Sequence, residues 1–235
     1  YSSNRSTKTE SNNIHDLPFV GATTSSAPST VYAFYNYYVY GTNFTTRRAS
    51  ISNNTISKLR STSSMYSSYN YYCYYMDFNG NMFDDNDIPS SSGVQYGIYT
   101  YQTLGCNINN NTIKNYNGGS QFWGIRNYQQ QNSSNMPTSI SGNTIENNAN
   151  VGNYFWAIAY ENVYNSTTSF LSINDNIIRD NVCNSYMQSI SSYNIGIYQF
   201  CWGNINIQRN KVLRNRATSG YYYGTYDYYT YNLNF

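Results

Sequence analysis

Three aspartates stand close together in the stretch FDDNDIP, at Asp84, Asp85 and Asp87. Calcium prefers carboxylate oxygens as ligands, so this spacing makes the stretch a weak candidate for a calcium site. The stretch lacks the glycine and the distal glutamate of an EF-hand loop. A solvated acidic turn is the favoured interpretation, and we expect no bound metal.

Few other residues could do chemistry. The single histidine, His15, lies in the N-terminal segment, where an exposed histidine is far more common than a catalytic one. The chain has no nucleophile elbow, no metal-ligand spacing and no glycine-rich phosphate loop. We therefore predict no catalytic residues, no cofactor and no enzymatic activity.

The chain contains 4 cysteines, and their spacing fits no metal site. In an oxidising compartment they could form two disulfides, Cys73 with Cys106 and Cys183 with Cys201. Cys106 occupies an inward-facing position of the repeat described below, so a buried free thiol is the competing interpretation.

The composition narrows the classes of partner. Of the 235 residues only 10% are charged, and the formal net charge is +2. This balance does not favour binding to nucleic acid or to an anionic membrane. No apolar run reaches the length of a membrane-spanning helix. Few charges, abundant Asn, Ser and Tyr, and N-x-S/T sequons such as those at Asn43 and Asn165 predict a secreted, extracellular or cell-surface protein.

A short phrase of the form I-x-x-N-x-I recurs along the chain, for example ISNNTI from Ile51 and ISGNTI from Ile140. The positions three before and two after the central asparagine are apolar in every copy. A spacing of five would change face on a continuous strand, so the chain must bend between the two apolar residues. We predict strand, sharp corner, strand, with the corner at the asparagine. The central asparagines are Asn54, Asn81, Asn111, Asn143, Asn176 and Asn210.

A second pattern occupies the other half of each repeat, in phrases such as YGI, WGI and WAI. A small residue stands at its centre, as at Gly97 and Gly124, and the next residue is usually apolar. Short strands at a near-constant period predict an all-β solenoid. We expect about six to seven coils of about 27–34 residues. An antiparallel sandwich is the less favoured alternative.

This pattern resembles the right-handed parallel β-helix of the pectin-lyase-like superfamily, as in secreted bacterial surface proteins with degenerate repeats. The resemblance covers residues 31–232 and implies that the six central asparagines form a stacked ladder. It says little about function. Enzymes of that superfamily act on acidic polysaccharides, with clustered carboxylates and a basic Arg or Lys. Here no basic residue recurs beside the aspartate cluster.

If Ile98 and Ile125 face inward, Gly97 and Gly124 should face outward, beside a bank of aromatic side chains on the same outer face. This face could stabilise its own sheet, contact a protein, or stack against a glycan. The candidate contact residues are Tyr35, Tyr37, Tyr69, Tyr71, Tyr99, Tyr101, Tyr128, Tyr198, Phe200, Tyr226 and Tyr228.

The two ends suggest how the chain is organised. Residues 1–30 are either a polar N-terminal arm or a degenerate first half-coil with Asn12 at the corner, and residues 31–235 form the β-helix domain. The C-terminal stretch YYYGTYDYYTYNLNF reads as a small-residue strand without its asparagine half. Ends of complementary type predict a structural protein that stacks head to tail with itself as a filament or surface layer. The alternative is a glycan-binding or adhesive β-helix, and a polysaccharide lyase or hydrolase ranks third.

Overall fold

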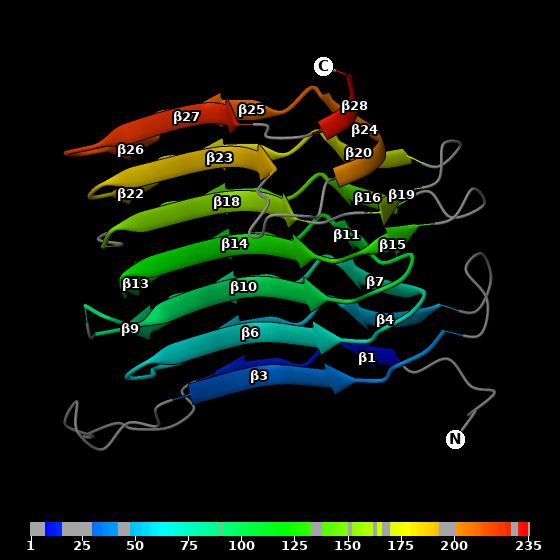
Figure 1. Cartoon of the computed structure of the whole chain (residues 1–235). Helices are drawn as coiled ribbons and strands as arrows, with labels where there is room; N and C mark the ends of the chain where they lie inside the picture. The colour runs from blue at the N-terminus through cyan, green and yellow to red at the C-terminus, as the bar shows by residue number, and fades with distance from the viewer. Residues whose placement is uncertain are drawn as a thin grey trace.

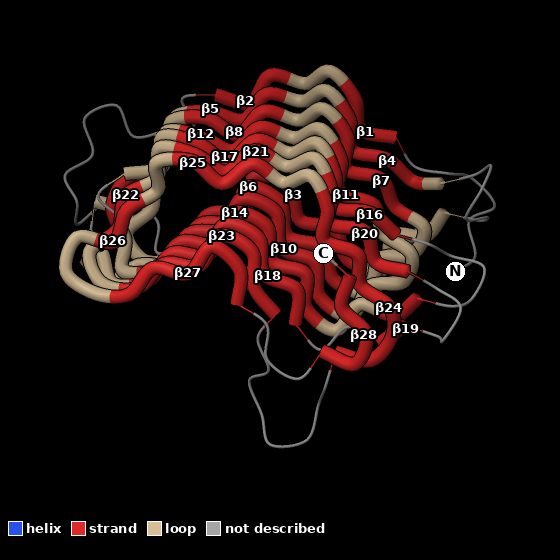
Figure 2. Tube along the Cα trace, turned by 90° about the horizontal axis from the view of Figure 1, so that it is seen from above, coloured by secondary structure: helices blue, strands red, loops and turns tan. Residues whose placement is uncertain are grey.

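The computed structural model describes residues 8–15, 30–41, 48–89, 91–132, 138–149, 152–161, 164–165, 170–192, 201–226 and 230–234. Within these residues the chain is all-β, without a helix, and every strand pairing is parallel. Strands far apart in the sequence lie one above another as successive rungs (Figure 1). Seen along the stack, the rungs superpose into one repeated outline (Figure 2), which is a parallel β-solenoid.

Three sheets run along the solenoid, and each coil contributes one strand to each of them. Sheet A contains β1 (Lys8–Glu10), β4 (Ala49–Ser52), β7 (Met76–Asn79), β11 (Asn107–Asn109), β16 (Thr138–Ser141), β20 (Phe170–Asn174), β24 (Cys201–Gln208) and β28 (Thr230–Asn234). Sheet B contains β2 (Asn13–His15), β5 (Thr55–Ser57), β8 (Met82–Asp84), β12 (Thr112–Lys114), β17 (Thr144–Glu146), β21 (Ile177–Arg179) and β25 (Lys211–Leu213). Sheet C contains the longest strands: β3 (Thr30–Tyr37), β6 (Ser64–Tyr71), β10 (Val94–Tyr101), β14 (Gln121–Tyr128), β18 (Tyr154–Glu161), β23 (Tyr186–Ser192) and β27 (Tyr221–Tyr226).

Short strands extend the coils beyond these sheets. They are β9 (Asp87–Ile88) with β13 (Asn117–Gly118), β22 (Val182–Cys183) with β26 (Arg216–Ala217), and β15 (Gln131–Asn132) with β19 (Tyr164–Asn165), which joins β24. They lie in the longer connections that lengthen each coil.

The corner between sheets A and B is the predicted one, but the residue that turns the backbone differs. The left-handed conformation belongs to the residue before each ladder asparagine, as in Asn53 (φ 56°), Gly80 (φ 67°) and Asn110 (φ 56°). Asn, Asp and Gly adopt this conformation at low cost. The ladder asparagine is therefore free to point its amide inward, where it bonds to neighbouring coils.

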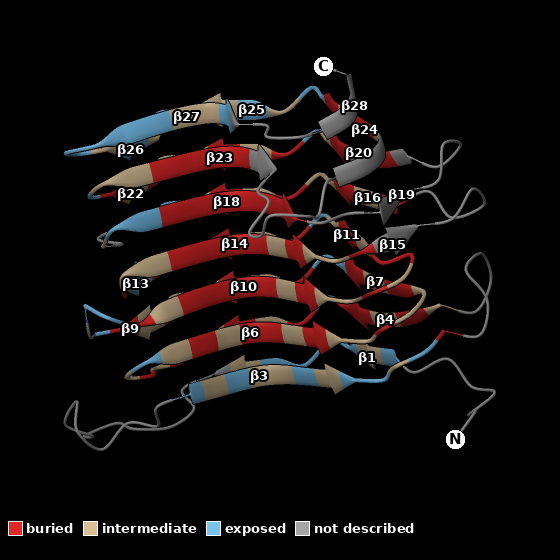
Figure 3. Ribbon diagram, in the orientation of Figure 1, coloured by how far each residue is buried: buried red, intermediate tan, exposed pale blue. Residues whose placement is uncertain are grey.

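The core lies between the three sheets and is filled mainly by isoleucine. The apolar residues on either side of the corner, such as Ile108 and Ile113, are fully buried, as are Ile98 and Ile125 from sheet C. The middle coils of sheet C are largely buried, whereas much of β3 and β27 at the two ends is exposed (Figure 3). Stacking therefore shields each coil, and the end coils lack that shield.

The prediction that Gly97 and Gly124 face outward is wrong. A Cβ placed on Gly97 would lie 2.8 Å from Cδ1 of the core residue Ile113, and one on Gly124 would lie 3.0 Å from Cδ1 of Ile145. The strand ladder skips this column, because Tyr96 pairs with Trp123 and Ile98 with Ile125. Each long strand thus bends at the small residue, and two successive residues turn inward.

Residues 8–15 belong to the solenoid, since β1 pairs with β4 and β2 with β5. The first coil therefore contains strands of all three sheets, and the rest of the predicted N-terminal arm lies outside the described residues. At the other end, β28 pairs with β24. The C-terminal stretch does begin a further asparagine half, contrary to the prediction.

Candidate functional site

The outer face of sheet C carries three columns of aromatic side chains, which we call the first, second and third aromatic columns. The first column is Tyr32, Tyr66, Tyr96, Trp123 and Trp156. The second column is Tyr35, Tyr69 and Tyr99, and the third is Tyr37, Tyr71, Tyr101 and Tyr128. The second and third columns contain the predicted tyrosines. The first column was missed, because the inward bend at the small residue moves its neighbours outward.

Four of the predicted contact residues stand apart from these columns. Tyr198, Phe200 and Tyr228 lie outside the described residues, and only the backbone of Tyr226 is described. Strand pairing aligns Ala159 with Ser191 and Ser191 with Tyr226, so Ser191 occupies the position expected for Tyr198.

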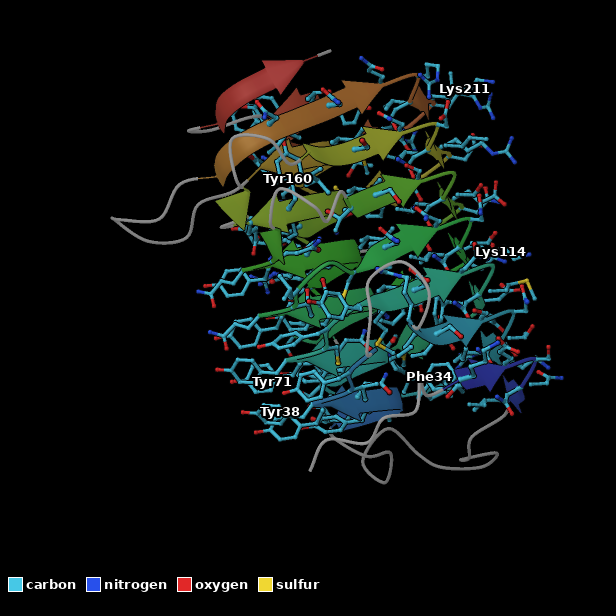
Figure 4. The ribbon with its side chains drawn as sticks, turned by 90° about the vertical axis from the view of Figure 1, so that its right-hand side faces the viewer. Phe34, Tyr38, Tyr71, Lys114, Tyr160 and Lys211 are labelled. Carbon is cyan, nitrogen blue, oxygen red and sulfur yellow. The ribbon has the colours of Figure 1, made fainter. Side chains whose placement is uncertain are left out.

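The rings stack along the solenoid axis. Tyr32 and Tyr66 have centroids 4.8 Å apart with planes 9° from parallel, and Tyr66 and Tyr96 are 4.6 Å apart at 5°. Trp123 and Trp156 are closer still, at 3.9 Å. Because each ring covers the faces of its neighbours, the columns present mainly ring edges to solvent. Figure 4 shows Tyr38 and Tyr71, at an edge of this face, projecting outward.

On the first coil, no described residue stacks on the outer side of the rings. Tyr32, Tyr35, Tyr37 and Tyr38 are 43%, 56%, 50% and 47% exposed. Their rings are stacked on one side, against the second coil. An aromatic surface of this size at one end of the molecule is typical of a contact site.

One ion pair is embedded in the aromatic face. Arg126, in the second column, donates from Nε and Nη2 to Oε2 of Glu161 at 3.0 and 2.9 Å. Its guanidinium lies 4.3 Å from the ring centroid of Trp123 and 5.3 Å from those of Tyr99 and Tyr128. The Glu161 side chain is fully buried, and its Oε1 has no hydrogen-bond partner in the described part of the chain. Burial raises the pKa of Glu161, and the charge of Arg126 opposes that rise.

The predicted asparagine ladder is present, and it has a direction. The amide Oδ1 of each member accepts hydrogen bonds from the backbone N–H and Nδ2 of the member one coil nearer the N-terminus. Asn12 joins the same chain, donating to Asn54 Oδ1 at 2.9 Å. Nδ2 also donates to a backbone carbonyl of the coil on its N-terminal side, as from Asn143 to Ile108. The ladder thus runs through the whole solenoid.

A second ladder lies at the end of sheet B and was not predicted. Asn148 accepts from the backbone N–H of Tyr116 and donates from Nδ2 to Asn181, which donates in turn to Asn215. Asn148 is fully buried. Its column also holds Leu59, Asn86 and Tyr116, and this mixed composition hid the pattern.

The aspartate cluster does not converge on a common point. Asp85 and Asp87 approach Arg60 at 3.5 and 3.3 Å, whereas Asp84 turns to Lys114 at 3.5 Å. Within the described residues, no three His, Cys, Asp or Glu side chains could together hold a metal ion. The basic side chains between these aspartates remove the geometric basis of the weak calcium hypothesis.

The carboxyl group of Asp87 makes stability depend on pH. Burial raises its pKa to about 6, with Arg60 opposing the rise and Asp85 adding to it. The folded chain therefore retains a proton that the unfolded chain, with a pKa of about 3.9, releases. This contribution to stability is present below about pH 4 and is lost as the pH rises through about 6.

We therefore expect Asp87→Asn to raise the free energy of unfolding at pH 7 by about 1 kcal/mol, after a discount for partial solvation, and to change it little at pH 4. Urea unfolding between pH 4 and 7.5 measures this difference. Asp85→Asn is the matched control, because Asp85 is more exposed and Asn tolerates its positive φ. A loss of stability at pH 7 in Asp87→Asn would show that the Arg60 ion pair outweighs burial.

The predicted disulfides are absent. Cys73, Cys106 and Cys183 are free, buried thiols. Adjacent coils are offset by 30 residues here, as Tyr74 pairs with Leu104, so the register aligns Cys73 with Thr103. The Sγ of Cys106 instead contacts the backbone carbonyl oxygen of Cys73 at 3.4 Å. Burial raises the pKa of Cys73 to about 11 and that of Cys106 to about 12, so both thiols stay protonated at neutral pH. The side chain of Cys201 lies outside the described residues.

Comparison with known proteins adds no relative: no family model, no curated protein and no solved structure matches the chain. A search of the described residues finds no helix long and apolar enough to cross a membrane. The fold and the ladder therefore define the class, a repeat protein built as a parallel β-solenoid.

Proposed function

We propose that the protein is an extracellular structural subunit that associates with itself end to end, as a filament or surface layer. The observation that carries this proposal is the pair of unpaired strand edges. Within the described residues β1, β2 and β3 end their sheets on one side, and β25 and β27 end theirs on the other. Unpaired backbone groups along a strand edge recruit another strand of matching direction.

The apolar end surfaces support the same proposal. At the first coil Ile14, Val31 and Phe34 are only partly buried, although they pack against the core. At the last coil Val212 is partly buried, and Tyr222 is 41% exposed in an inward-facing column. Covering both ends with a second copy would remove this apolar surface from water.

The three parallel sheets and the asparagine ladder also support a relationship to the right-handed parallel β-helices of the pectin-lyase-like superfamily. We include that relationship, and secretion to the cell surface, in the proposal. Because the net charge is only +2, electrostatic repulsion between copies is weak.

Light scattering with size-exclusion chromatography and electron microscopy of the purified chain tests this function. We expect particles whose mass rises with protein concentration and elongated assemblies of constant width. A chain that stays monomeric at high concentration contradicts the proposal.

A glycan screen on the same sample tests the alternative. The exposed tyrosine rings of the first coil favour that alternative, because a sugar stacks on a ring face and not on a ring edge. Glycan binding by a chain that remains monomeric would replace self-association with an adhesive function.

A further inference from the structure

The register of the end-to-end contact can be inferred from the strand columns, and this inference rests on the proposed self-association. We infer that the first coil of one copy continues the last coil of another, with β3 on β27, β2 on β25 and β1 on the free part of β24. The occupant of each open edge is thus a second copy of this chain.

Sheet C provides the first argument, because its columns match at the two ends. Tyr32 and Tyr223 stand in one outward column, linked through the intermediate coils. In the inferred register Tyr32 of the next copy lies beside Tyr223, which follows Gln188 at the end of the first aromatic column. The inward Val31 then covers Tyr222, which shares its column. Aromatic and apolar side chains thus meet like with like.

Sheet A provides the second argument. Among the described residues, the last strand β28 pairs with β24 only from Cys201 to Asn206, which leaves Ile207 and Gln208 without a strand partner on that edge. Thr9 of β1 stands in the same column as Ile51, and this column runs through the solenoid to Ile207. When β1 of the next copy stacks on β24, Thr9 therefore lies on Ile207 and Glu10 lies on Gln208.

The strands β28 and β1 would then share one strand position, end to end and in one direction. Among the described residues they overlap in the column of Asn206, where Asn234 and Lys8 of the next copy coincide. The end of one of these two strands must therefore move aside for both to share the edge of β24.

The direction of the asparagine ladder provides the third argument. At the C-terminal end the backbone N–H of Asn210 has no partner within the described residues, and its Nδ2 bonds only to the carbonyl of Ile173. At the N-terminal end Oδ1 of Asn12 accepts no hydrogen bond from the described part of the chain, while its N–H and Nδ2 both donate. Donors at one end and an acceptor at the other match only in head-to-tail stacking. Head-to-head contact would face acceptor with acceptor.

The space beside Gly224, the last member of the small-residue column of sheet C, supports the inferred contact. Inside the solenoid this column is tight: a Cβ on Gly124 would lie 2.6 Å from the carbonyl oxygen of Ala157 in the next coil. A Cβ on Gly224 has nothing within 4 Å, since among the described residues no strand pairs with β27 on that side. In the inferred register the carbonyl of Ala33 of the next copy fills that space.

Cysteine cross-linking tests the register. Asn13 and Lys211 are exposed and share one outward column of sheet B, at opposite ends of the solenoid. In the inferred contact their Cα atoms are about 5 Å apart, within the range of a disulfide. We expect Asn13→Cys/Lys211→Cys, in a Cys201→Ser background, to form a ladder of covalent multimers on oxidation.

The matched control is Asn13→Cys/Lys114→Cys, since Lys114 lies on the same sheet but near its middle (Figure 4). It should give no multimers. Assemblies that form in both variants but cross-link only through Lys114, or not at all, overturn the inferred register and leave the proposed function standing. Absence of assemblies in light scattering overturns both.

A second variant tests the contact without oxidation. Gly224→Val should leave the thermal midpoint of the monomer unchanged and raise the concentration needed for assembly about tenfold or more. Assembly at the unmodified concentration would show that β27 does not receive β3.

Discussion

Arg126→Leu should lower the free energy of unfolding by about 3–5 kcal/mol, because it leaves a buried carboxylate without its partner. Glu161 accepts two hydrogen bonds from this guanidinium, its side chain is fully buried, and its Oε1 already has no partner. Urea unfolding of the monomer measures the loss. The substitution also removes the cation from the rings of Trp123 and Tyr99, which adds a smaller loss.

The direction in which the stability of Arg126→Leu changes with pH distinguishes an unpaired buried carboxylate from lost side-chain packing. Burial raises the pKa of Glu161, and removing Arg126 removes the charge that opposes the rise. The unpaired carboxyl then folds best in its protonated form, so the stability of the variant falls as the pH rises. We expect the loss to be larger at pH 8 than at pH 5.

Two controls accompany Arg126→Leu. The double variant Arg126→Leu/Glu161→Leu should recover most of the lost stability, because no buried charge remains. Arg209→Leu breaks an exposed pair with Asp175 and should leave the free energy of unfolding nearly unchanged. A double variant as unstable as the single one would show that side-chain packing, and not the buried charge, dominates.

The asparagine corner was predictable from sequence because its constraint is local and repeated. Residues such as Ile108 and Ile113 are five apart and both must reach the core, which requires a bend between them. The ladder follows, since a buried amide at a bend must bond to its neighbours. Only the left-handed residue was misplaced, because Asn is common at both positions, as at Asn53 and Asn54.

The aromatic face was only partly predictable, because one bend in the strands of sheet C changes which residues face the core and which face outward. Simple alternation from Ile98 places Gly97 outside, but both residues turn inward and Tyr96 moves to the outer face of sheet C, where the neighbouring rings largely cover it. Alternation fails wherever a strand bends, and no residue type marks this bend apart from its small side chain.

The spacing of the small residues in sheet C could have corrected the position predicted for Tyr198. The predicted place of Tyr198 implies a small residue at Gly196, which is 39 residues after Ala157, whereas Ser189 follows Ala157 by 32. The ladder asparagines of the coils that hold Ala157 and Ser189 are Asn143 and Asn176, which are 33 apart. The period therefore favoured Ser189, and with it Ser191 in place of Tyr198.

The pairing of the cysteines was not predictable from their separation alone. A solenoid brings residues together only at the local coil length, which differs from coil to coil. Cys73 and Cys106 are 33 residues apart in a region where the coil length is 30.

The stacked rings explain why self-association ranks above glycan binding. A sugar needs an open ring face, and the columns cover those faces with one another along the solenoid. Open ring faces remain on β3. The rings of a second copy could stack on them at the same spacing as the rings within each aromatic column. The aromatic columns and the asparagine ladder thus favour the same contact.

Asn143→Leu should lower the free energy of unfolding by about 2–4 kcal/mol, and Asn148→Leu by about 1–3 kcal/mol. Asn143 Oδ1 accepts two hydrogen bonds from Asn111, and its Nδ2 donates to Asn176 and to the carbonyl of Ile108. Asn148 has fewer and longer bonds, including one of 3.4 Å to the carbonyl of Ile113. Leucine restores apolar volume but leaves these buried groups without partners.

Asn153→Leu is the control for both ladder variants, because Asn153 is exposed in the bend before β18 and should tolerate leucine within about 0.5 kcal/mol. Chemical unfolding of the three variants measures the order. A loss at Asn143 or Asn148 no larger than that at Asn153 would contradict the ladders as a source of stability. Equal losses at both ladders would show that hydrogen-bond length matters less than burial of the unpaired groups.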